Sequence, residues 1–194
     1  QELIHSPELR RQVRGILEKL GRKLVMPEEI VHYSEWVHAV RDRIAARKLR
    51  DMSGIRATVH PACHYHKLVA EDAVYMPEVY GGQRTAIVTA TLQVLGIDVR
   101  DYSTWFDCCG FGFRHILLSR DFSRSFAVQR KIEVMKEEAD PDVVVTHDTG
   151  CVTTLDHSQF AARAHGRNVG LPVMSASQIA ALAIKSDQPA TGGR

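Results

Sequence analysis

Residues 143–151 read Val-Val-Val-Thr-His-Asp-Thr-Gly-Cys, and they predict a strand that leads into a glycine and a cysteine. Three consecutive β-branched residues are typical of a strand buried on both faces, as in the middle of a parallel sheet. The Asp140-Pro141 pair before this run predicts the break that ends the preceding helix. The segment therefore favours an α/β fold in which Cys151 lies beyond the carboxyl end of a buried strand.

Strand and helix patterns alternate on both sides of this segment, from residue 54 onward. Strands are predicted at residues 55–60, 97–102 and 169–174. Helices are predicted at residues 85–95, 121–138, 159–165 and 175–184, the last of them capped by Ser175. Strands that alternate with helices imply a parallel sheet flanked by helices on both faces.

The first fifty residues predict helices instead. Ser6-Pro7-Glu8 is a helix start signal, because Ser caps, Pro takes the first helical position and an acid follows. A second helix is predicted from residue 34, with an apolar side formed by Trp36, Val37, Val40 and Ile44. The expected organisation is a helical segment at residues 1–53, a cysteine-rich domain at 54–185 and a disordered tail at 186–194.

The composition is that of an ordinary globular protein, with 44% hydrophobic and 25% charged residues in 194. The formal net charge of +2 is too small to indicate nucleic-acid binding, which usually needs a strongly basic surface. No apolar run approaches the roughly 20 residues that span a bilayer, and residues 1–5 do not resemble a secretion signal. The four cysteines then favour metal or redox chemistry in the cytoplasm over structural disulfides.

The cysteines follow three of the predicted strands. Cys63 follows the first strand, the adjacent pair Cys108 and Cys109 follows the second, and Cys151 follows the third. Because parallel strands point the same way, the loops at their carboxyl ends emerge at one edge of the sheet, where ligands bind in open α/β folds. We therefore expect the four sulfurs to gather around one metal site at this edge.

Glycines accompany two of these cysteine loops. Gly110 and Gly112 follow the cysteine pair, and Gly150 directly precedes Cys151. Glycine lets the backbone turn sharply and approach a bulky inorganic group, and amides near a cluster tune its redox potential by hydrogen bonding to sulfur. The three glycines are candidate cluster-loop residues, although ordinary loop glycines would give the same pattern.

Residue chemistry alone leaves the metal open. Soft thiolates on three separated loops favour an iron–sulfur cluster. Tetrahedral zinc with thiolate ligands is the competitor, but zinc sites usually draw ligands in C-x2-4-C pairs, and this chain has no C-x-x-C. The third alternative is that the cysteines are unligated or paired in disulfides.

These residues resemble a known family. Cys63, the Asp107-Cys108-Cys109-Gly110 run and a Val-Thr-x-x-x-x-Cys segment ending at Cys151 resemble the cysteine-rich CCG domain found in the B subunit of heterodisulfide reductase. The sulfur-oxidising heterodisulfide-reductase-like B subunits are relatives. The similarity covers roughly residues 25–185 and looks like the second half of such B subunits, which normally carry two of these domains.

The resemblance implies a [4Fe-4S] cluster of an unusual non-cubane type, which five cysteines hold in the family. The matching ligands here are Cys63, Cys108, Cys109 and Cys151. The last family pair is C-x-x-C, and Asp148 stands where its first cysteine would be. Asp148 is thus a candidate metal ligand, although a carboxylate is harder than a thiolate; the alternative is a simpler cluster that four thiolates hold. Alternative ligands or proton carriers are His60, His64, His66 and His147.

The resemblance also implies an oxidoreductase subunit for thiol–disulfide redox chemistry or electron transfer. Its expected partners are a ferredoxin-like iron–sulfur subunit, a flavin-containing subunit, and a thiol or disulfide substrate or sulfur carrier. Basic residues after the cysteine pair would steer an anionic substrate, namely Arg114, Arg120, Arg124 and Arg130. The alternative is a non-catalytic relay or structural zinc module that docks to partner subunits, which the aspartate at position 148 favours.

Overall fold

The structure is a computed structural model that describes residues 6–26, 31–62, 86–105, 107–112 and 117–184, together with Leu3 and Tyr65. It divides the chain into two compact units, Gln1–His32 and Tyr33–Arg194. In the first unit, α2 (Pro7–Lys19) begins as predicted, because the Ser6 side chain accepts the Leu9 N–H at 3.2 Å. The predicted start of this helix is confirmed.

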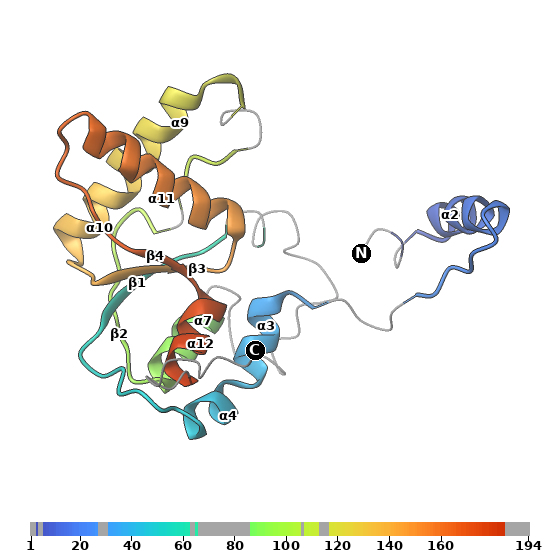
Figure 1. Ribbon diagram of the computed structural model, residues 1–194, viewed down its shortest axis with the longest axis horizontal. Coiled ribbons are helices and arrows are strands. Elements are labelled where there is room, and N and C mark those ends of the chain that lie inside the picture. Colours follow the sequence, from blue (N-terminus) through green and yellow to red (C-terminus); the bar gives the residue numbers. More distant parts are fainter. Residues whose placement is uncertain are drawn as a thin grey trace, which may run out of the picture. The chain divides into compact units, whose positions relative to one another are not determined.

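The second unit is built on a four-stranded parallel sheet (Figure 1). Its strands lie in the order β2 (Asp98–Val99), β1 (Arg56–His60), β3 (Val143–Thr146) and β4 (Val173–Ser175). All four residues of β3 are buried, as the β-branched run predicts. The predicted parallel α/β sheet is confirmed, with β2 and β4 shorter than expected.

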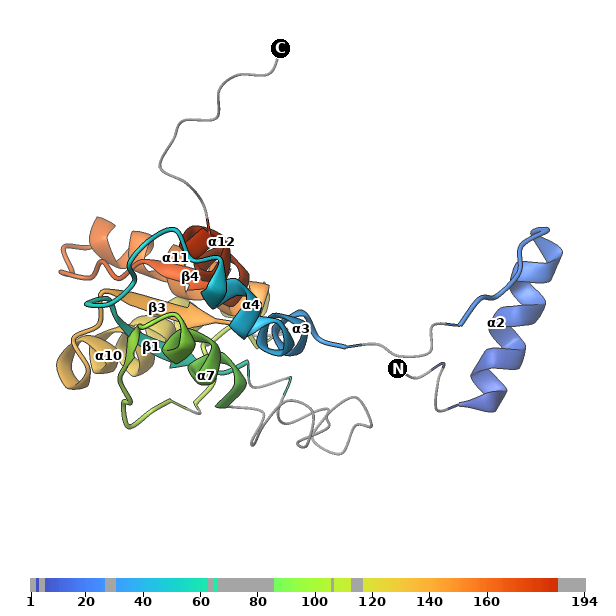
Figure 2. The same cartoon turned by 90° about the horizontal axis from the view of Figure 1, so that it is seen from below.

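Helices lie on both sides of the sheet, as Figures 1 and 2 show. One side carries α7 (Ala86–Val94) and α12 (Ala176–Ile184), against which α3 (Tyr33–Ala39) and α4 (Arg41–Ala46) pack. The other side carries α9 (Arg120–Phe126), the π-helical segment η1 (Ala127–Ile132), α10 (Glu133–Glu138) and α11 (Thr149–Ala164). None of the described helices is both long and apolar enough to cross a bilayer.

Helix α11 begins well before the predicted start at residue 159. Asp148 is its N-cap, since Asp148 Oδ1 accepts the Cys151 N–H at 2.9 Å. Thr149 and Gly150 have poor helix propensity, so this first turn depends on the cap and is hard to predict from apolar periodicity. The correction places Cys151 in the first turn of a helix rather than in a loop.

The helix predicted from residue 34 also differs from what the structure shows. It is divided into α3 and α4, and Trp36 is 60% exposed instead of lying on the buried side. The buried side of α3 is partly polar: Glu35 accepts the Tyr65 hydroxyl, and His38 Nδ1 lies 3.1 Å from the Ile87 carbonyl oxygen. Because these pairings satisfy buried polar groups, hydrophobicity alone did not identify the inner side.

The limits of the cysteine-rich domain stay a prediction. α3 and α4 pack against α7 and α12, and the compact unit that contains them begins at Tyr33. The predicted tail at residues 186–194 lies outside the described residues.

Two aspartates join the beginnings of β1 and β3. Arg56 forms ion pairs with Asp140 (Nη1–Oδ2 2.5 Å) and Asp142 (Nη2–Oδ1 2.7 Å). Asp142 Oδ2 also accepts the Arg56 backbone N–H at 2.8 Å. These contacts support a register in which Ala57 faces Val143, at the opposite end of the strands from the cysteines.

Candidate metal centre

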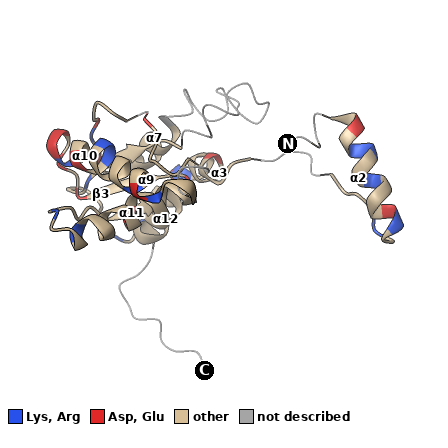
Figure 3. Ribbon diagram, turned by 90° about the horizontal axis from the view of Figure 1, so that it is seen from above, with Lys and Arg blue, Asp and Glu red and all other residues tan. Residues whose placement is uncertain are grey.

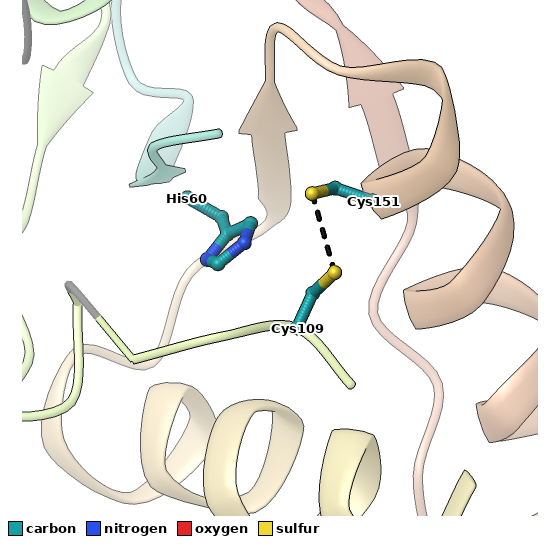
Figure 4. A group of neighbouring side chains, drawn as sticks. All are labelled: His60, Cys109 and Cys151. Atoms are coloured by element: carbon teal, nitrogen blue, oxygen red, sulfur yellow. Dashed lines mark hydrogen bonds between the residues drawn. The ribbon is translucent and has the colours of Figure 1, made fainter. Parts of the chain in front are cut away.

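Figure 4 shows three side chains gathered near the carboxyl ends of the strands: His60, Cys109 and Cys151. His60 is the last residue of β1, Cys109 lies in the segment between β2 and α9, and Cys151 is in the first turn of α11. The two Sγ atoms are 3.2 Å apart, and one ligand atom from each of the three residues lies within 4.8 Å of the others. We call these residues the Cys–His cluster.

The Cys–His cluster is shielded from solvent. Its three side chains are at most 3% exposed, and Tyr102 and Leu155 belong to the same part of the core as the two cysteines. The Sγ–Sγ distance is well beyond the roughly 2.05 Å of a disulfide bond, and Cys108, Cys109 and Cys151 are free thiols. Disulfide pairing among these three cysteines is therefore absent from the described part of the chain.

Burial disfavours charge within the cluster. Cys108 lowers the pKa of the Cys109 thiol, but the hydrogen bond with Cys151 and burial outweigh it, so the net shift is upward. Burial, followed by electrostatic interaction with Lys131 and, to a smaller extent, His147, holds the pKa of His60 well below its ordinary value. His60 is therefore a neutral imidazole, and a metal that binds here must displace thiol protons.

The donor set suits a thiophilic metal. Cysteine sulfur and imidazole are the ligands that iron–sulfur clusters and zinc take, whereas magnesium and calcium prefer oxygen. His60 Nε2 is buried and has no hydrogen-bond partner among the described residues. A bound metal would satisfy such an orphaned nitrogen beside two thiols. The residues present therefore fit an iron–sulfur or zinc centre.

The segment with the cysteine pair is held closely against α9. Gly110 has a φ of +92°, and a Cβ there would lie 2.7 Å from the Ser123 carbonyl oxygen. The Ser123 hydroxyl donates to the Gly110 carbonyl oxygen at 2.5 Å. Both the positive φ and the close approach require glycine, so Gly110 determines where this segment can lie.

Cys108 is half-buried beside Cys109. Contact with Cys109, and then burial, raise the pKa of its thiol, while the N–H groups of Gly110 and Gly112 act in the opposite direction. The Gly110 N–H donates to Cys108 Sγ at 3.4 Å. Two predicted cluster-loop glycines thus direct backbone N–H groups toward a predicted ligand sulfur.

Asp148 contacts the backbone of α11 through its capping bond and is not among the three residues of the Cys–His cluster. A Cβ on Gly150 would lie 3.0 Å from Asp148 Oδ1 and 3.1 Å from the Phe111 ring. Gly150 therefore leaves room for the cap and for Phe111. Metal ligation by Asp148 stays a prediction.

Cys63, His64 and His66 lie outside the described residues. The turn that leads toward them is anchored by His147, whose Nε2 accepts the Ala62 N–H at 2.9 Å. Its Nδ1 lies 3.0 Å from Ser34 Oγ. Because Nε2 accepts an N–H, the ring proton is on Nδ1 and donates to Ser34. His147 thus holds a turn.

Lys131 is a buried lysine near the cysteines, and its burial was not predicted from the sequence. Lys131 Nζ donates to the carbonyl oxygens of Thr104 and, at 3.2 Å, Trp105, and lies 4.8 Å from the centre of the Tyr102 ring. Burial lowers the pKa of Lys131 to about 8, although Asp107 and the cysteines act against this. The sequence offered one indication of this burial: Lys131 has helical spacing from Val128 and Met135, which are buried on the same side of the helix.

The basic residues after the cysteine pair have separate positions. Arg120 and Arg124 belong to α9, whose charges Figure 3 shows, and line a cavity of about 290 Å³ with Phe111 and His157. Arg130 pairs with Asp107 at 2.7 Å. Arg114 lies outside the described residues. The cavity offers positive charge close to the segment that carries the cysteine pair.

Comparison with known proteins adds the family context. The CCG cysteine-rich domain matches residues 57–156. A protein of Archaeoglobus profundus that resembles the heterodisulfide reductase B subunit is 28% identical, over 99% of this chain and 64% of its own length. Lactate utilization protein A of Macrococcus caseolyticus is 28% identical over 52% of this chain and 35% of its own length. The chain thus spans less than two thirds of either relative.

A solved structure shares the fold. The crystal structure of a hypothetical protein from Helicobacter pylori superposes with a TM-score of 0.64 and covers 96% of this chain and 32% of its own. Only 14% of residues are identical, so this similarity supports the fold alone.

Proposed function

Because the chain belongs to the CCG cysteine-rich domain family, alongside proteins that resemble the heterodisulfide reductase B subunit, we propose that it is the iron–sulfur subunit of a heterodisulfide-reductase-like complex. The observation that carries this proposal is the pair of buried sulfurs, Cys109 and Cys151, that meet at 3.2 Å near the carboxyl ends of the sheet. Segments far apart in the sequence converge there, as a shared inorganic centre requires.

The proposed ligands are Cys63, Cys108, Cys109 and Cys151, with Asp148 as a further candidate. When bound, a [4Fe-4S] cluster of the non-cubane type would supply one-electron transfer and direct contact with substrate sulfur. The surrounding residues exclude water, because Tyr102 and Leu155 pack in the same buried core as Cys109 and Cys151. Lys131 supplies a positive charge near the cysteines, which favours the negative charge of thiolate ligands.

The proposed reaction is thiol–disulfide conversion. A disulfide that takes up two electrons and two protons gives two thiols, and the reverse direction releases them. Electrons would come from, or pass to, a ferredoxin-like iron–sulfur subunit and a flavin-containing subunit in the cytoplasm. Arg120 and Arg124, in the cavity beside Phe111, would hold the anionic part of a thiol substrate or sulfur carrier.

A non-catalytic relay, or a structural zinc module, is the second candidate. The Cys–His cluster favours it, since two thiolates and one imidazole with one further ligand form an ordinary tetrahedral zinc site. The aspartate at position 148, where the family has a cysteine, favours it as well.

EPR spectroscopy of the full chain, purified without oxygen, separates these functions. A small thiol such as 2-mercaptoethanol should change the EPR signal of the oxidised protein, because sulfur contacts the cluster. Its S-methyl ether, which has no free thiol, is the matched control and should leave the signal unchanged. A brown protein whose signal ignores both compounds would support the relay, and a colourless protein with stoichiometric zinc would support the structural module.

A further inference from the structure

One nitrogen of His60 has no hydrogen-bond partner among the described residues, and His60 is not among the metal ligands proposed so far. His60 is fully buried, and its Nε2 has no hydrogen-bond partner among the described residues. A nitrogen in this state has lost its hydrogen bonds to water and gained none from the protein, which costs free energy. Buried ring nitrogens without a hydrogen-bond partner are therefore rare. In the Cys–His cluster, a ligand atom of this ring lies within 4.8 Å of both Cys109 Sγ and Cys151 Sγ.

The other ring nitrogen is already occupied. His60 Nδ1 lies 3.5 Å from the Tyr102 hydroxyl, the pairing that a metal-bound histidine makes when its second nitrogen donates to a neighbour. His60 also belongs to β1, where it is in register with Thr146 of β3. A ligand on a strand in the interior of a sheet is held more rigidly than one on a loop.

Two other possible donors near the cluster already accept backbone N–H groups. Asp148 Oδ1 caps α11 through the Cys151 N–H at 2.9 Å. His147 Nε2 accepts the Ala62 N–H at 2.9 Å. Among the described histidines, His60 alone combines proximity to the two sulfurs with an unpartnered ring nitrogen.

We propose that His60 Nε2 is a direct metal ligand, and that it completes the centre with Cys109 and Cys151 where this chain has Asp148 in place of a fifth cysteine. This inference rests on the proposed iron–sulfur function. It assigns a mixed sulfur and nitrogen ligand set, which raises the reduction potential of a cluster relative to an all-thiolate set.

Pulsed EPR on the full chain tests the ligand directly. Protein grown with 15N-histidine and with unlabelled histidine is purified without oxygen and brought to its EPR-active state. A nitrogen bound to iron gives a strong hyperfine coupling that changes with the isotope. The expected result is this isotope-sensitive coupling in the parent, its loss in His60→Cys, and its retention in His165→Ala, an exposed control at the C-terminal end of α11.

The outcomes separate the two proposals. Iron without any isotope-sensitive coupling in the parent overturns the His60 assignment and leaves the iron–sulfur proposal standing. A coupling that persists in His60→Cys or in His60→Asn, the second variant in case the first does not fold, overturns it as well. Protein that takes up no iron overturns the proposed function itself.

Discussion

The Sγ atoms of Cys109 and Cys151 lie 3.2 Å apart, although the two residues are 42 positions apart in the sequence. The contact follows from the parallel sheet, because Cys109 comes after β2 and Cys151 comes after β3. Burial of both sulfurs and the raised pKa of the Cys109 thiol make the contact unfavourable for thiolates unless a cation balances them. The metal centre proposed above would supply that balance.

Lys131 is expected to tune the redox potential of the centre. Lys131→Met removes a positive charge near the cysteines, so reduction becomes less favourable and the reduction potential becomes more negative. A redox titration followed by EPR measures the shift. Lys136→Met is the matched control, because Lys136 is on the same helical stretch but donates to the Asn168 carbonyl oxygen in an exposed position. Equal potentials in the parent and Lys131→Met would contradict the role given to Lys131.

Gly110 is expected to be irreplaceable in the segment that carries the cysteine pair. Gly110→Ala combines a left-handed backbone, which costs about 1–2 kcal/mol for an L-residue, with a Cβ 2.7 Å from the Ser123 carbonyl oxygen. Gly166→Ala is the control, since Gly166 has a φ of +78° and nothing within 4 Å of its Cβ position. Chemical denaturation should show a clearly larger loss of stability in Gly110→Ala, together with reduced iron content. Equal losses would show that the approach to α9 is unimportant.

Asp148 is expected to stabilise α11 as a cap. Asp148→Ala removes the acceptor of the Cys151 N–H and should lower the free energy of unfolding by about 1 kcal/mol. Asp148→Asn keeps an oxygen in the same place and should lose much less. If the cap is the whole role of Asp148, both variants keep the iron content and the EPR spectrum of the parent. Loss of iron in both would identify Asp148 as a ligand instead.

The ion pair between Arg56 and Asp142 predicts an acid dependence of stability. Hydrogen bonds from Arg56 lower the pKa of Asp142 to about 2, from an ordinary value of about 3.9. A lowered pKa means that the stabilisation is complete above about pH 4 and is lost as the pH falls toward 2. The stability difference between the parent and Asp142→Asn should therefore shrink from pH 4 to pH 2. A constant difference across this range would contradict it; Asp101→Asn, at an exposed carboxylate, is the control.

The fold was predictable where local pattern and tertiary environment agree. The β-branched run at residues 143–145 predicts a buried strand, and β3 is buried throughout. Cys109 and Cys151 were expected at one edge of a parallel sheet, and they meet there. That prediction came from the parallel arrangement of the strands, and not from the sequence around either cysteine.

Other features of the fold and the site depend on tertiary contacts, which the pattern of residue types along the sequence does not reveal. The first turn of α11 requires the Asp148 cap, because Thr149 and Gly150 do not favour a helix by themselves. Lys131 looks like a solvent-facing lysine until its carbonyl partners, Thr104 and Trp105, are known. In the sequence, His60 is one of several histidines close to the predicted ligand Cys63. Only the structure shows that it lies beside the sulfurs of Cys109 and Cys151.

The most direct test of the account is the iron and acid-labile sulfide content of the full chain, purified without oxygen and measured beside Cys108→Ser and Cys109→Ser. The account predicts iron and sulfide together in the parent and a strong loss of both in each variant, because a hydroxyl oxygen replaces a soft thiolate ligand. Unchanged iron in both variants, or a parent that holds stoichiometric zinc and no sulfide, would contradict it.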